Sequence, residues 1–290
     1  MNISMIGVGK MGLPMARHLL ASGYRVKAFD ASPSARKGAL DAGIELHESL
    51  EAAISAEALI ISSLPDDAAF LTVGQAVASK ARSGTIFLDT STISLEASAK
   101  VAVLCADRKI QYLRTTVSGN NKMAEAAQLT VMASGPQATY EQVKPILAAW
   151  GPVQFYLGDA EQARLMKLVI NLMIAATANM LSEALVLGQK GGLDWKQMWD
   201  VICSSAVASP IIKAKAVQLR EHDYAPTFTV AQMQKDVGII LAAGAQLQVP
   251  LAMTAGIGQQ LQAAAAQGDV GLDYAAVIRA VARSAGVSVK

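Results

Sequence analysis

Charged residues, aromatic residues and cysteines are all scarce in this 290-residue sequence. Charged residues make up 17% of the chain and the formal net charge is +2, so neither nucleic acid nor a membrane surface is expected as a partner. The only cysteines, Cys105 and Cys203, lie far apart, and neither has another cysteine or a histidine at metal-ligand spacing. We therefore expect no disulfide framework, no metal site and a cytoplasmic location.

Long apolar runs are missing as well. The first ten residues have no basic region ahead of their apolar stretch, which a signal peptide would have. The uncharged segment Val237–Gly268 is interrupted by glutamines, glycines and Pro250, so it is not a continuous apolar span of about 20 residues. We expect a buried pair of helices broken at Pro250, and no membrane span.

Hydrophobic residues make up 52% of the chain, enough for a sizeable core in one large or two medium domains. The low charge and the twelve methionines favour extensive buried helix and a subunit interface. We expect a homodimer or a homotetramer.

Short apolar segments alternate with helical segments in the first part of the chain, which is typical of a parallel sheet covered on both faces. The predicted strands are Ile3–Ile6, Tyr24–Asp30, Ala58–Leu64, Thr85–Leu88, Ile110–Leu113 and Leu129–Ala133. We predict an α/β Rossmann-type, doubly wound N-terminal domain over residues 1–160.

The remaining residues, 161–290, are predicted to form an all-α C-terminal domain that binds substrate and carries the oligomer contacts. Leu165–Leu187 is apolar at helical spacing and long enough for about six turns. The other predicted helices are Trp195–Cys203, Pro210–Arg220, Val230–Ala243, Leu251–Ala266 and Tyr274–Ala285.

A glycine motif of the form G-x-G-x-x-G lies between the first strand and the first helix. Gly7 permits a tight turn, Gly9 lets the backbone approach a pyrophosphate, and Gly12 permits close packing of helix on strand. Asp30 is at the end of the predicted second strand, where a carboxylate binds ribose hydroxyls and repels a 2′-phosphate. The pattern predicts a dinucleotide site that favours NAD, and Arg36 leaves NADP open.

Several ordered motifs make the sequence similar to the β-hydroxyacid dehydrogenases over nearly its whole length. They are IGVGKMGLPMARHL from Ile6, SLPDD at Ser63–Asp67, DTSTIS at Asp89–Ser94, TTVSGNN at Thr115–Asn121, Lys167 with Asn171, and Phe228 with Lys235-Asp236. The resemblance implies hydride transfer between a nicotinamide and a small β-hydroxy acid or its semialdehyde.

The resemblance also implies roles for individual residues. Lys167 would be the general acid and base. Substrate would contact Ser118, Gly119, Asn120, Asn171, Phe228 and Thr92. The cofactor would contact Gly7, Gly9, Lys10, Met11, Gly12, Asp30, Leu64, Pro65, Thr92, Lys235 and Asp236.

Lys167 stands out on its residue chemistry alone. It is the only charge between Arg164 and Glu183, on an otherwise apolar helix. A lysine there must snorkel, find a partner or have its pKa lowered by desolvation, and the last two suit proton transfer to or from a hydroxyl. Asn171, four residues later, shares its helix face and could orient the lysine or bind the hydroxyl.

Two segments depart from the family pattern. The substrate loop, commonly Asp-Ala-Pro-Val-Ser-Gly-Gly, reads RTTVSGN from Arg114, so Asn120 adds a side chain that either bonds the substrate or fills space. The turn Gly158–Ala163 lacks further glycines that the family usually has. Both departures put 3-hydroxyisobutyrate in question as the substrate.

Two alternative functions follow. Imine reductases share this overall plan but usually carry Asp or Tyr at the position of Lys167, and a protonated lysine would repel an iminium. The chain could also bind a dinucleotide without turnover. Lys167, Asn171 and Asp236 together argue against that second alternative.

Overall fold

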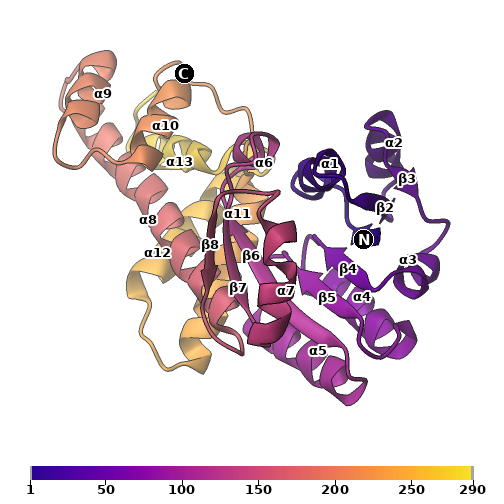
Figure 1. The fold of residues 1–290 in the computed structure, drawn as a ribbon. Helices are drawn as coiled ribbons and strands as arrows, with labels where there is room; N and C mark the ends of the chain where they lie inside the picture. Colours follow the sequence, from indigo (N-terminus) through magenta and orange to yellow (C-terminus); the bar gives the residue numbers. More distant parts are fainter. Residues whose placement is uncertain (1, 289–290) are drawn as a thin grey trace. The chain divides into compact units, whose positions relative to one another are not determined.

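The structure is a computed structural model that describes residues 2–288. The chain divides into two structural units, Met1–Lys167 and Leu168–Lys290, and each is described here by itself (Figure 1). The first unit is α/β and the second is all-helical, which confirms the predicted fold class.

An eight-stranded sheet forms the centre of the first unit, in the order β3-β2-β1-β4-β5-β6-β7-β8. The predicted strands are confirmed, with β6 extended beyond its predicted end. The strands are β1 (Asn2–Ile6), β2 (Arg25–Phe29), β3 (Glu45–Leu46), β4 (Leu59–Ser62), β5 (Ile86–Asp89), β6 (Gln111–Ser118), β7 (Thr130–Ser134) and β8 (Val153–Tyr156). The order is that of a doubly wound dinucleotide-binding sheet with two added strands.

The expectation of a purely parallel sheet is wrong at its far edge. The six strands β3-β2-β1-β4-β5-β6 are parallel to one another. Strand β7 pairs antiparallel with β6, and β8 runs parallel to β7. The connection from β6 to β7, residues 119–129, contains only the short helix α6 (Asn121–Glu125) and is at the lower limit of the length that a parallel crossover needs. The edge strand β8 was not predicted, because its apolar Val153 and Phe155 alternate outward.

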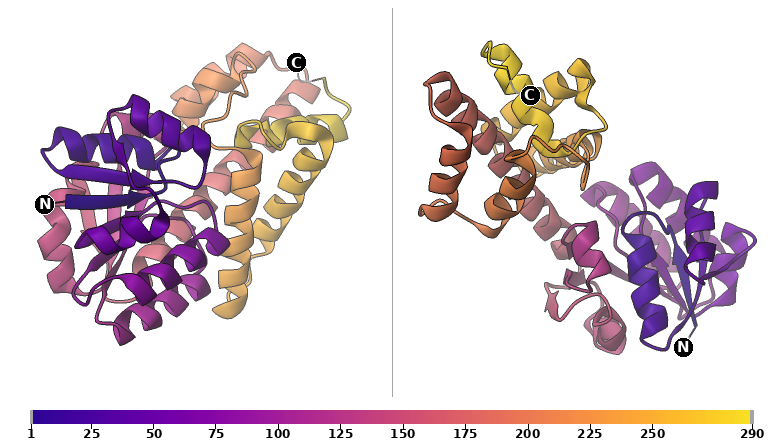
Figure 2. Two further views of the ribbon diagram at one scale, coloured as in Figure 1. Left: turned by 90° about the vertical axis from the view of Figure 1, so that its right-hand side faces the viewer. Right: turned by 90° about the horizontal axis from the view of Figure 1, so that it is seen from above.

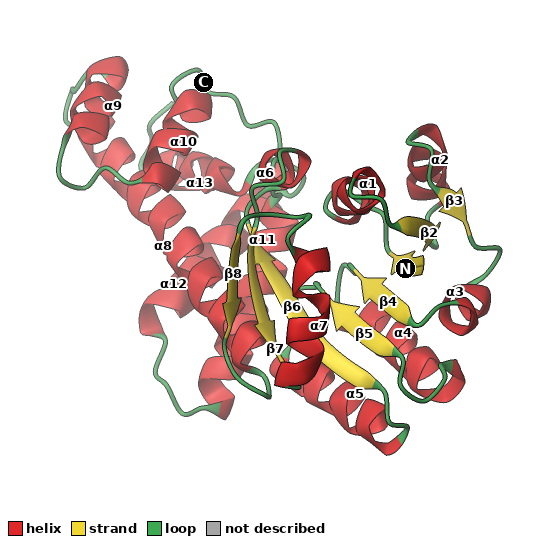
Figure 3. Ribbon diagram, viewed as in Figure 1, coloured by secondary structure: helices red, strands yellow, loops and turns green. Residues whose placement is uncertain are grey.

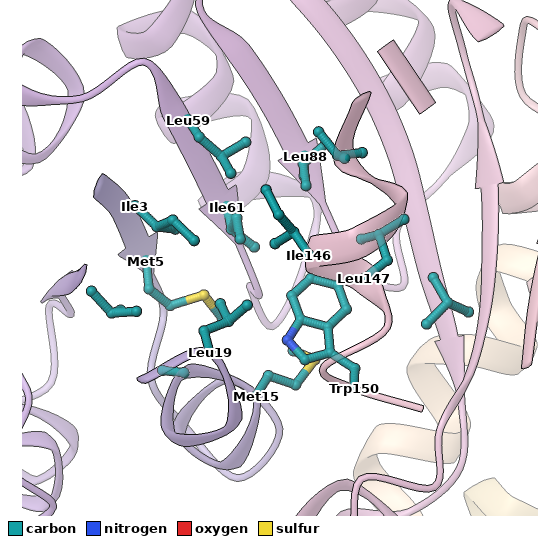
Figure 4. Close-up of a cluster of buried hydrophobic side chains, with 14 of the residues drawn as sticks. Ile3, Met5, Met15, Leu19, Leu59, Ile61, Leu88, Ile146, Leu147 and Trp150 are labelled. Atoms are coloured by element: carbon teal, nitrogen blue, oxygen red, sulfur yellow. The ribbon is translucent and has the colours of Figure 1, made fainter. Parts of the chain in front are cut away.

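Helices cover both faces of the sheet, as the different views show (Figures 2 and 3). One face carries α1 (Gly12–Ala21) and α7 (Gln137–Leu147), whose buried side chains pack on the strands together with Trp150 (Figure 4). The opposite face carries α3 (Leu50–Ala56), α4 (Asp67–Lys80) and α5 (Leu95–Asp107). Helix α2 (Pro33–Asp41) follows β2.

The second unit is built on α8 (Gln162–Lys190), which begins in the first unit. The other elements are α9 (Trp195–Ser204), α10 (Pro210–Leu219), α11 (Val230–Gln246), α12 (Ala252–Ala264), a π-helical turn (Ala265–Asp269), a 3-10 turn (Tyr274–Ala276) and α13 (Val277–Ser284). Helices α11 and α12 lie side by side (Figure 2), and the predicted break at Pro250 separates them. The predicted helix Tyr274–Ala285 begins instead with the 3-10 turn.

Helix α8 is long and apolar enough to cross a membrane by length and composition, the only such helix in the described range 2–288. In its most apolar window, 44% of the residues are buried. Ala175, Leu181 and Leu185 belong to the two hydrophobic clusters of the helical unit. These contacts are those of a central helix in a folded helical unit.

Candidate functional site

The glycine turn after β1 has two glycines required by the protein's own packing and one that is not. Gly7 has φ +88°, and an added Cβ would lie 2.2 Å from the Ser63 carbonyl oxygen; at Gly12 it would lie 2.0 Å from the Gly7 carbonyl oxygen. At Gly9 a Cβ would meet nothing within 4 Å. Gly9 therefore leaves open space at the N-terminus of α1, where a pyrophosphate fits.

Asp30 connects this turn to the loop after β2. Its Oδ2 accepts a hydrogen bond from the Val8 backbone N–H at 2.8 Å, and its Oδ1 accepts one from the Ser32 N–H at 2.8 Å. A carboxylate has about four acceptor positions, so two are left for ribose hydroxyls. Arg36, on α2, is exposed.

The loops after β4 and β5, which contain Leu64, Pro65 and Thr92, are held together by a buried network. Asp89, at the end of β5, accepts hydrogen bonds from the hydroxyls of Ser62 and Ser91. Ser91 Oγ in turn accepts from the Leu64 backbone N–H at 2.8 Å. The two predicted cofactor loops are thus tied to one carboxylate.

Arg164 completes that network, a role that sequence reasoning missed. Its fully buried guanidinium donates to Asp89, to the Ser91 carbonyl and to the Tyr112 hydroxyl at 2.9 Å. Burial alone would lower the pKa of Arg164, but Tyr112 and Asp89 hold it above its ordinary value. The first turn of α8 is therefore anchored to β5, three residues before Lys167.

The candidate substrate loop follows β6. Gly119 has φ +139°, and a Cβ there would lie 2.6 Å from Leu129 Cδ2, so the turn requires glycine. Asn120 is exposed, and its Oδ1 accepts a hydrogen bond from the Met123 N–H at 3.0 Å. The added side chain therefore caps α6, a role that the sequence did not indicate.

The other departures from the family pattern in this segment lie on β6, where Arg114 and Thr116 are buried and have partners within the first unit. Arg114 forms an ion pair with Glu161, and its guanidinium stacks 4.5 Å above the Tyr112 ring. Thr116 Oγ1 donates to the Ala163 carbonyl at 2.9 Å. These side chains join β6 to the segment before α8. Of the departures discussed, Asn120 is therefore the one whose exposed side chain is placed to affect the choice of substrate.

Three of the predicted residues of the helical unit come together. Asn171 is buried and its Nδ2 donates to Asp236 Oδ2 at 2.6 Å, while Lys235 Nζ lies 3.0 Å from Asp236 Oδ1. Phe228 is half-buried and packs edge-on against Tyr274, with ring centroids 6.2 Å apart. Asn171 and Lys167 both lie on α8, one turn apart.

Comparison with known proteins identifies the family. Residues 2–158 match the NAD-binding domain of 6-phosphogluconate dehydrogenase, and residues 162–281 match the NAD-binding domain of NADP-dependent 3-hydroxyisobutyrate dehydrogenase. The chain is 34% identical to 2-(hydroxymethyl)glutarate dehydrogenase of Eubacterium barkeri, covering 99% of this chain and 97% of that protein. The chain belongs to the β-hydroxyacid dehydrogenase family.

Solved structures agree with this assignment. The structure of Mycobacterium tuberculosis 3-hydroxyisobutyrate dehydrogenase with L-serine has a TM-score of 0.88 and 28% identity, covering 97% of this chain and 98% of that one. An imine reductase from Pseudomonas sp. shares the fold at a TM-score of 0.60 and 23% identity, covering 97% of this chain and 99% of that one. This β-hydroxyacid dehydrogenase is an NAD(P)-dependent oxidoreductase.

Replacing Gly9 with alanine in this dehydrogenase is expected to weaken NAD(H) binding at least about tenfold, or by about 1.4 kcal/mol. The methyl group would occupy the open space that the pyrophosphate needs, while touching no protein atom within 4 Å. The free energy of unfolding should change by no more than about 0.5 kcal/mol. Cofactor titration and urea unfolding measure the two quantities.

Gly12→Ala is the comparison variant for the stability measurement. Its methyl group would overlap the Gly7 carbonyl, so it should lower the free energy of unfolding, which Gly9→Ala should not. Gly9→Ala protein that bound NAD(H) as tightly as the wild type would contradict a pyrophosphate at this turn.

Two histidines of the first unit have defined side-chain contacts. His47 is buried, with Nε2 2.9 Å from Ser4 Oγ. His18 does act at a helix end, where its Nε2 lies 3.0 Å from the Ala124 and Glu125 carbonyl oxygens of α6. No group of metal-ligating side chains occurs among the residues that the structure describes.

The buried His47 gives the dehydrogenase a pH-dependent stability. Burial lowers the pKa of His47, and the charge of Lys27 lowers it further. The unfolded chain therefore binds this proton first as the pH falls below about 6.5, and stability declines from there down through the lower folded-state pKa. Urea unfolding over this pH range should show a smaller decline for His47→Gln; an equal decline would exclude His47 as its source.

Proposed function

We propose that this enzyme transfers hydride between NAD and a small β-hydroxy acid or its semialdehyde, with Lys167 as general acid and base. The observation that carries the proposal is the anchored start of α8, where Arg164 is bonded to Asp89 one helical turn before Lys167. The same carboxylate organises the loops that contain Leu64 and Thr92. The proton-transfer group and the cofactor loops therefore share one rigid support.

The chain's residues have separate tasks in this mechanism. A bound nicotinamide would supply the acceptor for the hydride that leaves the hydroxyl-bearing carbon. Backbone N–H groups of Ser118, Gly119 and Asn120 hold the substrate carboxylate. Neutral Lys167 removes the hydroxyl proton in oxidation, and its ammonium returns a proton in reduction.

The helical unit supplies the remaining proposed contacts. The side-chain NH2 group of Asn171 donates to Asp236. The Asn171 Oδ1 is then the atom that accepts a hydrogen bond from the substrate hydroxyl or from Lys167. Phe228 contacts the substrate's apolar part, and Lys235 and Asp236 contact the cofactor. Lys10, Met11, Pro65 and Thr92 are proposed to line the cofactor in the N-terminal domain, 1–160.

We propose NAD rather than NADP as the preferred cofactor. The Asp30 carboxylate accepts two backbone hydrogen bonds and has acceptor positions left for a ribose diol, whereas a 2′-phosphate would face its charge. Comparison of kcat/KM for the two cofactors tests this. A preference for NADP, through Arg36, would overturn it.

The substrate proposal also predicts a small effect for Asn120→Gly. The Asn120 side chain is exposed and its oxygen caps a five-residue helix, so restoring the family's glycine should change kcat/KM for the best hydroxy acid by less than about tenfold, or 1.4 kcal/mol. Steady-state kinetics on a panel of hydroxy acids measure the change. A switch in the preferred acid would show that Asn120 contacts the substrate.

A homodimer or homotetramer in the cytoplasm is the proposed assembly, with contacts in the domain 161–290. Met173, Met180 and Leu187 recur every seven residues on α8 and are 64%, 52% and 76% exposed. That spacing is typical of a helix–helix seam, and a second copy would present the same stripe. Sedimentation of Met180→Lys protein should show a smaller particle than the wild type if the seam is used.

Imine reduction is the second candidate. It is favoured by the shared fold and disfavoured by Lys167, whose ammonium would repel an iminium. Turnover of a cyclic imine, with no hydroxy acid accepted, would reverse this order. A chain that bound NAD and turned over neither class would be a non-catalytic dinucleotide-binding protein.

A further inference from the structure

We infer that the Arg114–Glu161 ion pair is a positioning device that sets Lys167 relative to the substrate loop; the inference rests on the proposed function. Arg114 is the charged residue of one segment that departs from the family pattern, and Glu161 is one of two acidic residues in the other, with Asp159. Arg114 and Glu161 meet in one partly buried contact, with side chains 7% and 21% exposed. The two segments that depart from the family pattern are therefore in direct contact through this ion pair.

The pair lies between the two elements that carry the proposed chemistry. Arg114 is on β6, four residues or about 13 Å before Ser118, where the substrate loop begins. Glu161 directly precedes α8, six residues or about 9 Å before Lys167. The ion pair thus joins the strand that leads into the carboxylate-binding loop to the helix that carries the proton-transfer group.

The remaining contacts of this turn are neutral hydrogen bonds. Ser134 Oγ donates to the Ala160 carbonyl at 2.7 Å and accepts from the Ala163 N–H at 3.1 Å. Thr116 Oγ1 donates to the Ala163 carbonyl. These bonds fix the backbone that follows Glu161. The ion pair adds a contact between two charged side chains, beside the hydrogen bond that the Arg164 guanidinium donates to Tyr112 on β6.

Charge-assisted hydrogen bonds are directional, and a fixed side-chain geometry is what a proton-transfer group needs. A displacement of about 1 Å in a reacting group can reduce turnover roughly 100-fold without removing any catalytic atom. The ion pair therefore acts by holding Lys167 in position. Its loss should lower kcat more than it weakens the binding of the cofactor.

The test variant is the double substitution Arg114→Met/Glu161→Leu in the full chain. Replacing a buried ion pair with apolar residues is often neutral for stability, so the melting temperature and the Kd for NADH should stay near wild type. We expect kcat for the best hydroxy acid to fall roughly 10- to 100-fold. Wild-type kcat at unchanged melting temperature would overturn the inference.

A second variant decides the matter if the double variant does not fold. Glu161→Asp keeps the charge but shortens the side chain, and it should lower kcat at unchanged Kd for NADH; unchanged kcat would overturn the inference. If the wild type oxidises no hydroxy acid, the proposed function itself fails. An active wild type whose kcat is matched by the variants removes only the positioning role.

Discussion

Replacing Lys167 with methionine is expected to lower kcat for hydroxy acid oxidation by roughly 10²- to 10⁴-fold, the usual contribution of a general acid or base. Methionine keeps the apolar stem of the side chain and removes the amine. The Kd for NADH should stay within about twofold, or 0.4 kcal/mol, because the glycine turn lies between β1 and α1 and Asp30 directly follows β2, away from Lys167 in the sequence. Steady-state kinetics and fluorescence titration of NADH measure the two effects.

Lys213→Met is the matched control for this loss. Lys213 is an exposed lysine on α10 and has no role in the proposed chemistry. Its substitution should leave kcat unchanged. A Lys167→Met enzyme with kcat within tenfold of wild type would assign proton transfer to another group.

Replacing Arg164 with methionine is expected to reduce the free energy of unfolding by about 3–5 kcal/mol, the usual cost of breaking a buried ion pair. Asp89 would keep the hydroxyl donors of Ser62 and Ser91 but lose its only cationic partner among the described residues. Because Asp89 also holds the Leu64 and Thr92 loops, affinity for NADH should fall as well. Urea unfolding and cofactor titration measure both changes.

Arg17→Met serves as the control, since Arg17 is exposed on α1 and its replacement should change stability by no more than about 0.5 kcal/mol. A loss below about 1 kcal/mol for Arg164→Met would mean that the network does not hold the first turn of α8.

Local sequence patterns predicted much of this fold. The buried strands β4 and β5 each begin with three consecutive apolar residues, and α8 has apolar residues at helical spacing, so each could be predicted from its own residues. The antiparallel direction of β7 depends on how residues 119–129 connect it to β6, and β8 is a half-exposed edge strand. The residues of β7 and β8 alone predict neither feature.

The site was predictable where a motif is local and not where a contact joins distant segments. The glycine turn and Asp30 lie within one βαβ unit, so their spacing is informative. Arg164 and Asp89 are far apart in the chain, and so are Arg114 and Glu161. Their pairings arise from the arrangement of β5, β6 and the start of α8, which no single segment encodes.

The most direct test of the central claim is formation of NADH by wild-type and Lys167→Met enzyme on a panel of β-hydroxy acids. We predict that the wild type oxidises at least one of them and that the variant binds NADH but loses turnover roughly 10²- to 10⁴-fold. A wild-type enzyme that binds NADH yet oxidises no hydroxy acid and reduces no semialdehyde would contradict the account.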